Sequence, residues 1–359
     1  MPYRPRARAL ALGLLASLAL PAAPAPAAAP RFVFGRSPSV FQNDPDVVAT
    51  RLGLWLDASY VDNDRESGSV DLNHVNLLVD TRWRSFQGFL EVEYENEVDR
   101  YGAEEEEEFE IEQAYLRFGP RDGASLRLGR FNTPAGIWMP VHWSILMETI
   151  EKPPHAAREL LPEQQVGAEL AGRLFPGLLR ELAGQLDYAV YAGASGDAIG
   201  QEDVEGFTVG ADLRLLLDER WLLGTSVYRQ KNDEVDDRSE LNLMLYGEAK
   251  LPAALTFRTE YLHQRRERPR GKPWDRTLDV VYGALRWDFA RWFYANYRVS
   301  FGGDDGPDER TTDQLVNTFT LGIEPHPAVR LKLEYSLHEF SGGGRQDFDF
   351  WGTSVGVRF

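Results

Sequence analysis

From about position 49 onward, hydrophobic and polar residues alternate along most of the chain. In the first such stretch, Leu52, Leu54 and Leu56 share one parity, whereas Arg51 and Asp57 fall on the other. Successive side chains of a β-strand point to opposite faces, so this period-two pattern predicts strands with one apolar and one polar face. Sixteen strands are predicted, at 49–60, 70–83, 86–96, 109–118, 124–131, 165–172, 184–192, 204–217, 220–230, 239–251, 253–263, 277–288, 291–302, 313–325, 328–339 and 347–359.

The connections between these strands alternate between short turns and long polar loops. An even strand number with this alternation is typical of an outer-membrane barrel. A soluble β-sandwich is the alternative, but its strands are shorter and its outward faces are polar. An open sheet with so large an apolar face would aggregate, and closure removes its edges. The sequence therefore predicts an all-β protein, a closed antiparallel transmembrane barrel of about 16 strands.

The longest connection runs from Phe131 to Gln164, 34 residues without a strand pattern. Its prolines are Pro134, Pro140, Pro153, Pro154 and Pro162. Proline excludes a long helix or a central strand there. A structureless segment of this length inside a strand-dense domain is usually functional. We expect this third long loop, 131–164, to fold into the barrel and to narrow a channel.

The N-terminal region predicts export. Three arginines precede the short apolar run Ala9–Leu20, and Ala25-Pro26-Ala27 offers the small residues of a cleavage site. We therefore assign 1–29 to a cleaved signal peptide, 30–48 to a linker and 49–359 to the barrel. The expected location is the outer membrane of a Gram-negative bacterium, with membrane lipid and lipopolysaccharide as neighbours.

Composition restricts the possible chemistry. The chain has no cysteine, which excludes disulfides and thiolate chemistry, and its formal charge is −17. Loss of the three N-terminal arginines with the signal peptide makes the charge −20. Nucleic acid is not an expected partner, because phosphates require a basic surface. No H-E-x-x-H or G-x-S-x-G motif occurs, so we expect no cofactor, no metal and no enzyme. An outer-membrane hydrolase is the enzymatic alternative.

Aromatic residues are abundant, with 9 Trp, 14 Tyr and 19 Phe. Those near predicted strand ends include Tyr60, Trp83, Tyr94, Trp221, Trp287, Trp292 and Trp351. Most have the apolar parity, which favours an interfacial girdle over a track for sugars. The chain also ends an alternating strand on Phe359, which resembles the assembly signal of Gram-negative outer-membrane proteins.

The run LRLGRFNTPAGIWMPVHW at Leu126–Trp143 resembles the strand-to-loop segment of the family that includes the phosphate-selective porins O and P. The matching residues are Gly129, Arg130, Phe131, Pro134, Gly136 and Trp138. The resemblance implies a homotrimeric 16-stranded diffusion channel with an inward-folded loop. Phosphate-selecting relatives line the pore with arginines and gather lysines near its mouth, whereas this chain has five lysines and a lumen face of mixed sign. A general porin for small polar solutes or inorganic ions is therefore expected. An anion- or phosphate-selective channel is one alternative, and a plugged structural or adhesive barrel is another.

Two groups of charged residues are candidate pore residues. The candidate constriction comprises Arg127, Arg130, His142, Glu148, Glu151, Lys152, His155 and Arg158. The candidate lumen lining comprises Arg51, Arg82, Glu91, Glu93, Arg258, Arg298, Arg330 and Lys332. Opposed charges at the narrowing would create a transverse field. The alternative is that the charges only pin the loop to the wall. The acidic run Glu104–Glu108 is expected in a solvated outer loop, with a divalent cation site as the lesser possibility.

Overall fold

The computed structural model describes residues 49–63, 66–98, 105–120, 123–141, 143–153, 162–176, 179, 183–195, 206–232, 238–267, 276–305, 313–341 and 346–359. The predicted signal peptide and linker, 1–48, lie outside these residues.

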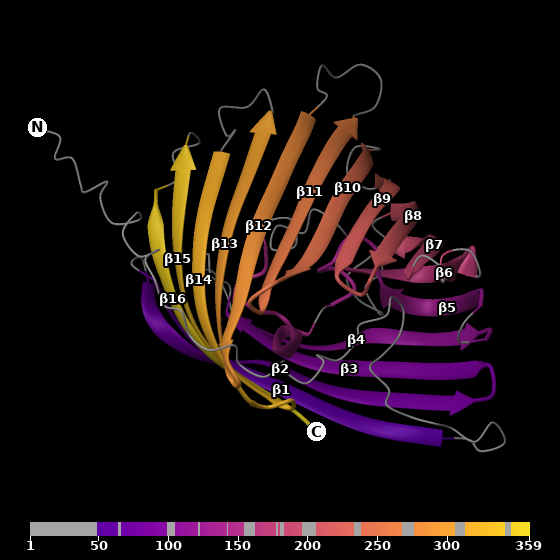
Figure 1. The fold of residues 1–359 in the computed structure, drawn as a ribbon, viewed down its shortest axis with the longest axis horizontal. Helices are drawn as coiled ribbons and strands as arrows, with labels where there is room; N and C mark the ends of the chain where they lie inside the picture. The colour runs from indigo at the N-terminus through magenta and orange to yellow at the C-terminus, as the bar shows by residue number, and fades with distance from the viewer. Residues whose placement is uncertain are drawn as a thin grey trace, which may run out of the picture.

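Sixteen antiparallel strands form one closed barrel in which each strand pairs with its sequence neighbours (Figure 1). The predicted fold class is therefore confirmed. The strands are β1 (Ala49–Asn63), β2 (Glu66–Trp83), β3 (Phe86–Val98), β4 (Glu105–Phe118), β5 (Ser125–Asn132), β6 (Gln164–Leu174), β7 (Gly184–Ser195), β8 (Gly206–Leu217), β9 (Trp221–Asn232), β10 (Arg238–Leu251), β11 (Leu255–Glu267), β12 (Arg276–Ala290), β13 (Phe293–Asp305), β14 (Asp313–His326), β15 (Val329–Ser341) and β16 (Phe348–Arg358). In the described part of the chain, no helix is long and apolar enough to cross a membrane.

The ring closes between β1 and β16, where Trp55 is paired with Arg358. The ladder continues beyond β16, because the Phe359 amide donates to the Leu54 carbonyl oxygen at 2.8 Å. Tight turns join neighbouring strands at the end of the barrel opposite the longer connections. Asp218 and Glu219, for example, both have positive φ (50° and 55°), the backbone geometry of a two-residue hairpin turn that follows the strand twist.

The two faces of the wall divide as the alternation predicts. Leu52 is 74% exposed, whereas Trp55, three residues away on the other face, is 1% exposed. The outward face is rich in leucine, valine and aromatic residues, and the inward face carries most of the charged residues. The predicted girdle tryptophans Trp83, Trp221, Trp287, Trp292 and Trp351 are all exposed.

Several strands extend further than predicted at the ends that carry the long loops. The largest difference concerns the acidic run, because Glu105–Glu108 belong to β4 rather than to an outer loop. They pair with residues 95–98 of β3, and Glu106 stands opposite Glu97. The expectation of an outer loop was therefore wrong for Glu105–Glu108, whereas Glu104 lies outside the described residues. The alternation that marks a strand is hidden there because every residue of the run is a glutamate.

Candidate functional site: the inward segment

Hydrogen bonds join the two ends of the segment between β5 and β6. The Thr133 amide donates to the Glu163 carbonyl oxygen at 2.8 Å, and the Thr133 hydroxyl donates to the Pro162 carbonyl oxygen at 2.5 Å. Gln165 also donates to the Thr133 hydroxyl oxygen at 3.2 Å. The two ends of the segment are therefore held at one point of the wall.

Its first contacts are with the inner face of β8, β9 and β11. The Gly136 amide donates to the Ser226 hydroxyl at 3.1 Å, and its carbonyl oxygen accepts from Arg214 at 2.7 Å. Gly136 has φ of +67°, and a Cβ there would lie 2.5 Å from a carboxylate oxygen of Glu260. Only glycine fits this close approach and this backbone conformation. Next along the chain, the Ile137 amide donates to that Glu260 carboxylate.

Two tryptophans then fasten the segment to different parts of the wall. The Trp138 indole donates to the Tyr282 hydroxyl on β12. The Trp143 indole donates to Glu91 on β3 at 2.6 Å, and its ring lies 6.3 Å from that of Trp55 on β1. In a ring of 16 strands, β3 and β12 stand nearly opposite each other. The segment therefore spans the lumen from one wall to the other.

A short 3-10 helix, η1 (Ser144–Leu146), follows on the far side and lies within the ring of strands (Figure 1). Ile145 packs against Gly356 of β16, where a Cβ would meet the isoleucine side chain at 3.1 Å. Ile150 packs with Val61 and Phe350 in a second apolar contact with the same side of the wall. These side chains are buried, as expected for residues that anchor the segment.

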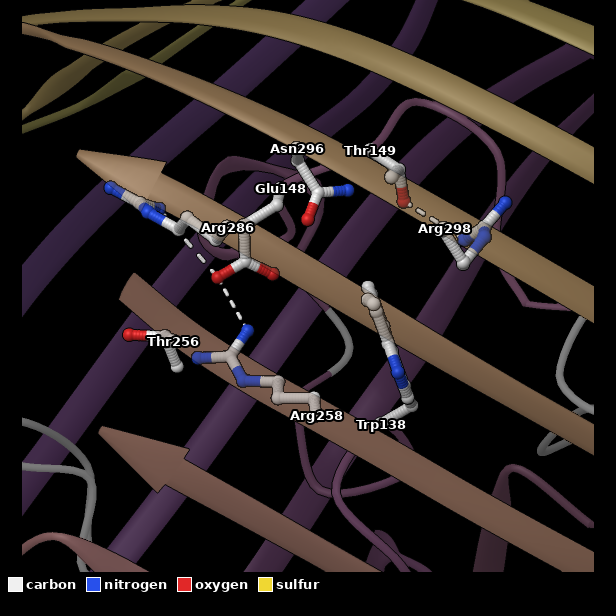
Figure 2. A pocket seen from close by; sticks show the side chains of 9 residues that line it. Trp138, Glu148, Thr149, Thr256, Arg258, Arg286, Asn296 and Arg298 are labelled. Carbon is white, nitrogen blue, oxygen red and sulfur yellow. Dashed lines mark hydrogen bonds and ion pairs between the residues drawn. The ribbon is translucent and has the colours of Figure 1, made fainter. Parts of the chain in front are cut away.

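Arginines of the wall hold residues 147–151, which we call the tip of the segment. The Glu148 carboxylate forms an ion pair with Arg258 of β11 and lies 3.6 Å from Arg286 of β12 (Figure 2). Burial by itself would raise the pKa of Glu148, but Arg258, Arg286 and Arg330 favour the charged form more strongly. The pKa of Glu148 therefore falls to about 2, and the carboxylate is ionised at neutral pH.

Wall side chains also bind the backbone on both sides of Glu148. Four carbonyl oxygens accept hydrogen bonds from the wall: Met147 from Arg330 (2.8 Å), Glu148 from Tyr294 (3.1 Å), Thr149 from Lys332 (2.9 Å) and Glu151 from Arg298 (2.8 Å). The amides of Ile150 and Glu151 donate to the two carboxylate oxygens of Glu334 at 2.7 and 2.8 Å. Buried backbone groups need such partners, and this irregular stretch obtains them from the barrel wall.

The structure separates the predicted constriction residues into three groups. Glu148, Glu151 and Lys152 lie in the described part of the segment, where Glu151 faces His338 (3.1 Å) and Lys152 faces Glu163 (3.1 Å). Arg127 and Arg130 belong to the wall strand β5 rather than to the segment itself. They pair with Glu169 and Glu110 on neighbouring strands. The remaining three, His142, His155 and Arg158, lie outside the described residues.

The predicted lumen residues all occupy inward positions of their strands. Arg298 and Lys332 bind the segment directly, whereas Arg82 pairs with Asp80 on its own strand at 2.8 Å. Sequence reasoning did not single out Arg286, Tyr294, Tyr282 and Glu334 as binders of the segment. Their inward parity was a signal for the lumen face, but parity does not reveal which inward residues the segment reaches.

The chemistry available here is electrostatic and steric. Among the residues that the structure describes, no group of three or more His, Asp or Glu is placed to hold a metal ion. Trp138, Arg258, Arg286 and Arg298 surround Glu148 in a small pocket between the segment and the wall (Figure 2). The arrangement can restrict the lumen cross-section and present charge to what passes.

Comparisons with known proteins place the fold. No family model matches the chain, and no curated protein matches it by sequence. Similar solved structures include the trimer form of OmpT, an outer membrane protein of Vibrio cholerae (TM-score 0.65, 10% identity, 88% of this chain and 100% of that one). An anion-selective porin from Comamonas acidovorans has a TM-score of 0.61 at 9% identity, covering 87% and 100%. The outer membrane channel DcaP of Acinetobacter baumannii has a TM-score of 0.59 at 10% identity, covering 89% and 99%. At these identities the likeness establishes a shared fold.

Proposed function

We propose that the protein is a passive diffusion porin of the Gram-negative outer membrane, which passes small hydrophilic solutes or ions through a lumen narrowed by the 131–164 segment. The observation that carries this proposal is the attachment of the segment to opposite walls, by Trp138 on one side and Trp143 on the other. A segment held in this way limits the size of what can pass. No chemical step is needed, and solutes move down their gradient.

Single-channel conductance in a planar bilayer tests the proposal. Purified full-length protein and a variant lacking residues 140–160 would be measured side by side. The deletion removes Trp143, Glu148 and the backbone bound by Arg298 and Lys332, so it should widen the lumen and raise the conductance several-fold. Absence of conductance in both folded proteins would contradict the porin and favour a plugged structural or adhesive barrel.

An anion- or phosphate-preferring channel is the second candidate. Its support is the gathering of Arg258, Arg286, Arg298, Arg330 and Lys332 on β11–β15 around the segment. Against it stand the acids on the same wall, including Glu334 and Glu324, which offset much of this charge. The sign of the reversal potential under a salt gradient, with and without phosphate, distinguishes the two. A homotrimer in contact with lipid and lipopolysaccharide, exported through a 1–29 signal peptide that is then cleaved, completes the proposal.

A further inference from the structure

Residues 147–151 lie on the barrel wall as a peptide lies in a binding site. Within five residues, four carbonyl oxygens and two amides are bound by side chains of the wall. Main-chain hydrogen bonds of this kind do not depend on the identity of the peptide's side chains, so they would serve any chain of similar conformation.

Two side chains of the same stretch enter sites of distinct chemistry. Glu148 lies between Arg258 and Arg286, whereas Ile150 packs against Val61 and Phe350. The wall therefore presents a cationic site and, for the residue two positions later, an apolar site. These two sites together would favour a peptide in which an acidic residue is followed, two positions later, by an aliphatic residue.

The cationic site is held in place without Glu148. Arg258 also pairs with Glu248 at 2.6 Å, and Arg286 also pairs with Asp288 at 2.7 Å and with Glu324 at 3.2 Å. These partners are on the wall itself, so the contacts that support both guanidinium groups do not depend on the segment. A site whose supporting contacts do not involve its ligand is preorganised for another ligand.

We propose that this inner wall is a binding site for short acidic peptides, and that residues 147–151 occupy it as an internal ligand. The inference rests on the proposed function, because a peptide reaches the wall only through the lumen. An entering peptide competes with the segment, so its apparent affinity is its intrinsic affinity multiplied by the fraction of molecules in which the wall is free. Weakening the internal ligand should therefore strengthen binding of the external one.

Isothermal titration calorimetry on the purified full-length protein tests this directly. The probe is the capped pentapeptide Ac-Met-Glu-Thr-Ile-Glu-NH2, which copies residues 147–151, and its matched control has Gln in place of the first Glu. Glu148→Gln weakens the internal ligand and leaves every wall residue in place. We expect the acidic peptide to bind Glu148→Gln about tenfold more tightly than it binds the natural chain.

The same variant should prefer the acidic peptide over the Gln peptide by about fivefold or more, since a charge-assisted pair is the stronger contact. Adding Arg258→Gln should remove that preference. Equal binding of both peptides by folded Glu148→Gln, or no binding of either, overturns the inference. If Glu148→Gln does not fold, Glu148→Asp, which keeps the charge but shortens its reach, takes its place. Conductance of the same Glu148→Gln protein shows whether its lumen is open, so absence of peptide binding in a conducting variant overturns this inference and leaves the porin proposal standing.

Discussion

At the residue scale, three inward tyrosines pack closely against glycines of the adjacent strand. A Cβ on Gly322, Gly224 or Gly210 would fall 1.9–2.3 Å from the ring of Tyr294, Tyr246 or Tyr191. The absent side chain makes room for a large ring close to the wall. In the first pair this fixes Tyr294, which donates to the Glu148 carbonyl oxygen and lies under the Arg286 guanidinium, 4.0 Å from the ring centre.

Gly322→Ala should therefore displace the Tyr294 ring and loosen the tip of the segment. Overpacking of this kind costs about 1–3 kcal/mol of unfolding free energy. The control is Gly283→Ala, whose Cβ would meet Phe257 at an ordinary 3.7 Å. Midpoints of urea unfolding in lipid vesicles measure both changes. In a Tyr294→Ala background, Gly322→Ala should become nearly neutral, and full additivity of the two changes would contradict the mechanism.

The Glu148 carboxylate predicts a specific pH dependence. Its pKa falls from the ordinary 4.5 of a glutamate to about 2 on folding, so the carboxylate stabilises the folded state above pH 4.5. That contribution is lost as the pH falls through the interval between these two values. Glu148→Gln should cost about 1–3 kcal/mol at pH 7, because it leaves Arg258 and Arg286 only their wall partners.

The difference in unfolding free energy between the natural chain and Glu148→Gln should be the same at pH 7 and pH 5.5. It should shrink between pH 4.5 and pH 2. Glu339→Gln, which removes one carboxylate from the exposed outward face of β15, is the matched control for the loss of a charge. A difference that already declines between pH 7 and pH 5.5 would show that Glu148 is not held in its charged form.

At the scale of elements, the strands and the segment differ in how far their sequences predict them. The period-two pattern predicted all sixteen strands, because one wet and one apolar face impose it on each strand separately. Prolines predicted that 131–164 forms no long regular element. The path of the segment was beyond prediction, because its contacts join distant positions: Ile150 and Glu334 are 184 residues apart. Arg298 and Lys332 were identified by their inward positions on the strands, and Arg286 and Tyr294 occupy inward positions too. Only the path of the segment determines which inward residues bind it.

The attachment of the segment to β3 predicts a local effect of Trp143→Phe. The substitution removes the hydrogen bond to Glu91 and retains an aromatic ring near Trp55. We expect faster exchange of the Leu146 amide, which donates to the Trp143 carbonyl oxygen at 2.9 Å within the turn of η1. Loss of one hydrogen bond to a charged group, worth about 1.5–3 kcal/mol, corresponds to roughly tenfold or more in the exchange rate.

Amide exchange followed by mass spectrometry would measure this effect. Trp351→Phe, on the outward face of β16, is the control and should leave exchange in η1 unchanged. Unchanged exchange in both variants would mean that the apolar contacts of Ile145 hold η1 without Trp143.

At the scale of the whole molecule, several charges of the inner wall are balanced by an opposite charge close by. Arg127 pairs with Glu169 and Arg330 with Glu324, the latter at 2.7 Å. The fields of two opposite charges this close nearly cancel at distances much larger than their separation. Salt screens what remains, with a screening length of about 8 Å at physiological ionic strength. Where such pairs line the wall, they exert little net field on a passing ion. We therefore expect the natural chain to show weak ion selectivity, with a reversal potential near zero.

The local balance also predicts how selectivity can be created. Glu324 is shared by Arg286 and Arg330, so Glu324→Gln removes one negative charge that offsets two cations. The channel should then pass anions more readily than cations, and the reversal potential should shift in the anion-selective direction. The shift should be larger in 0.01 M than in 1 M salt, because the screening length falls from about 30 to about 3 Å. Glu339→Gln removes the same charge from the outward face and should leave the potential unchanged. An equal shift in both variants would mean that the protein's net charge sets selectivity rather than the charge of this wall.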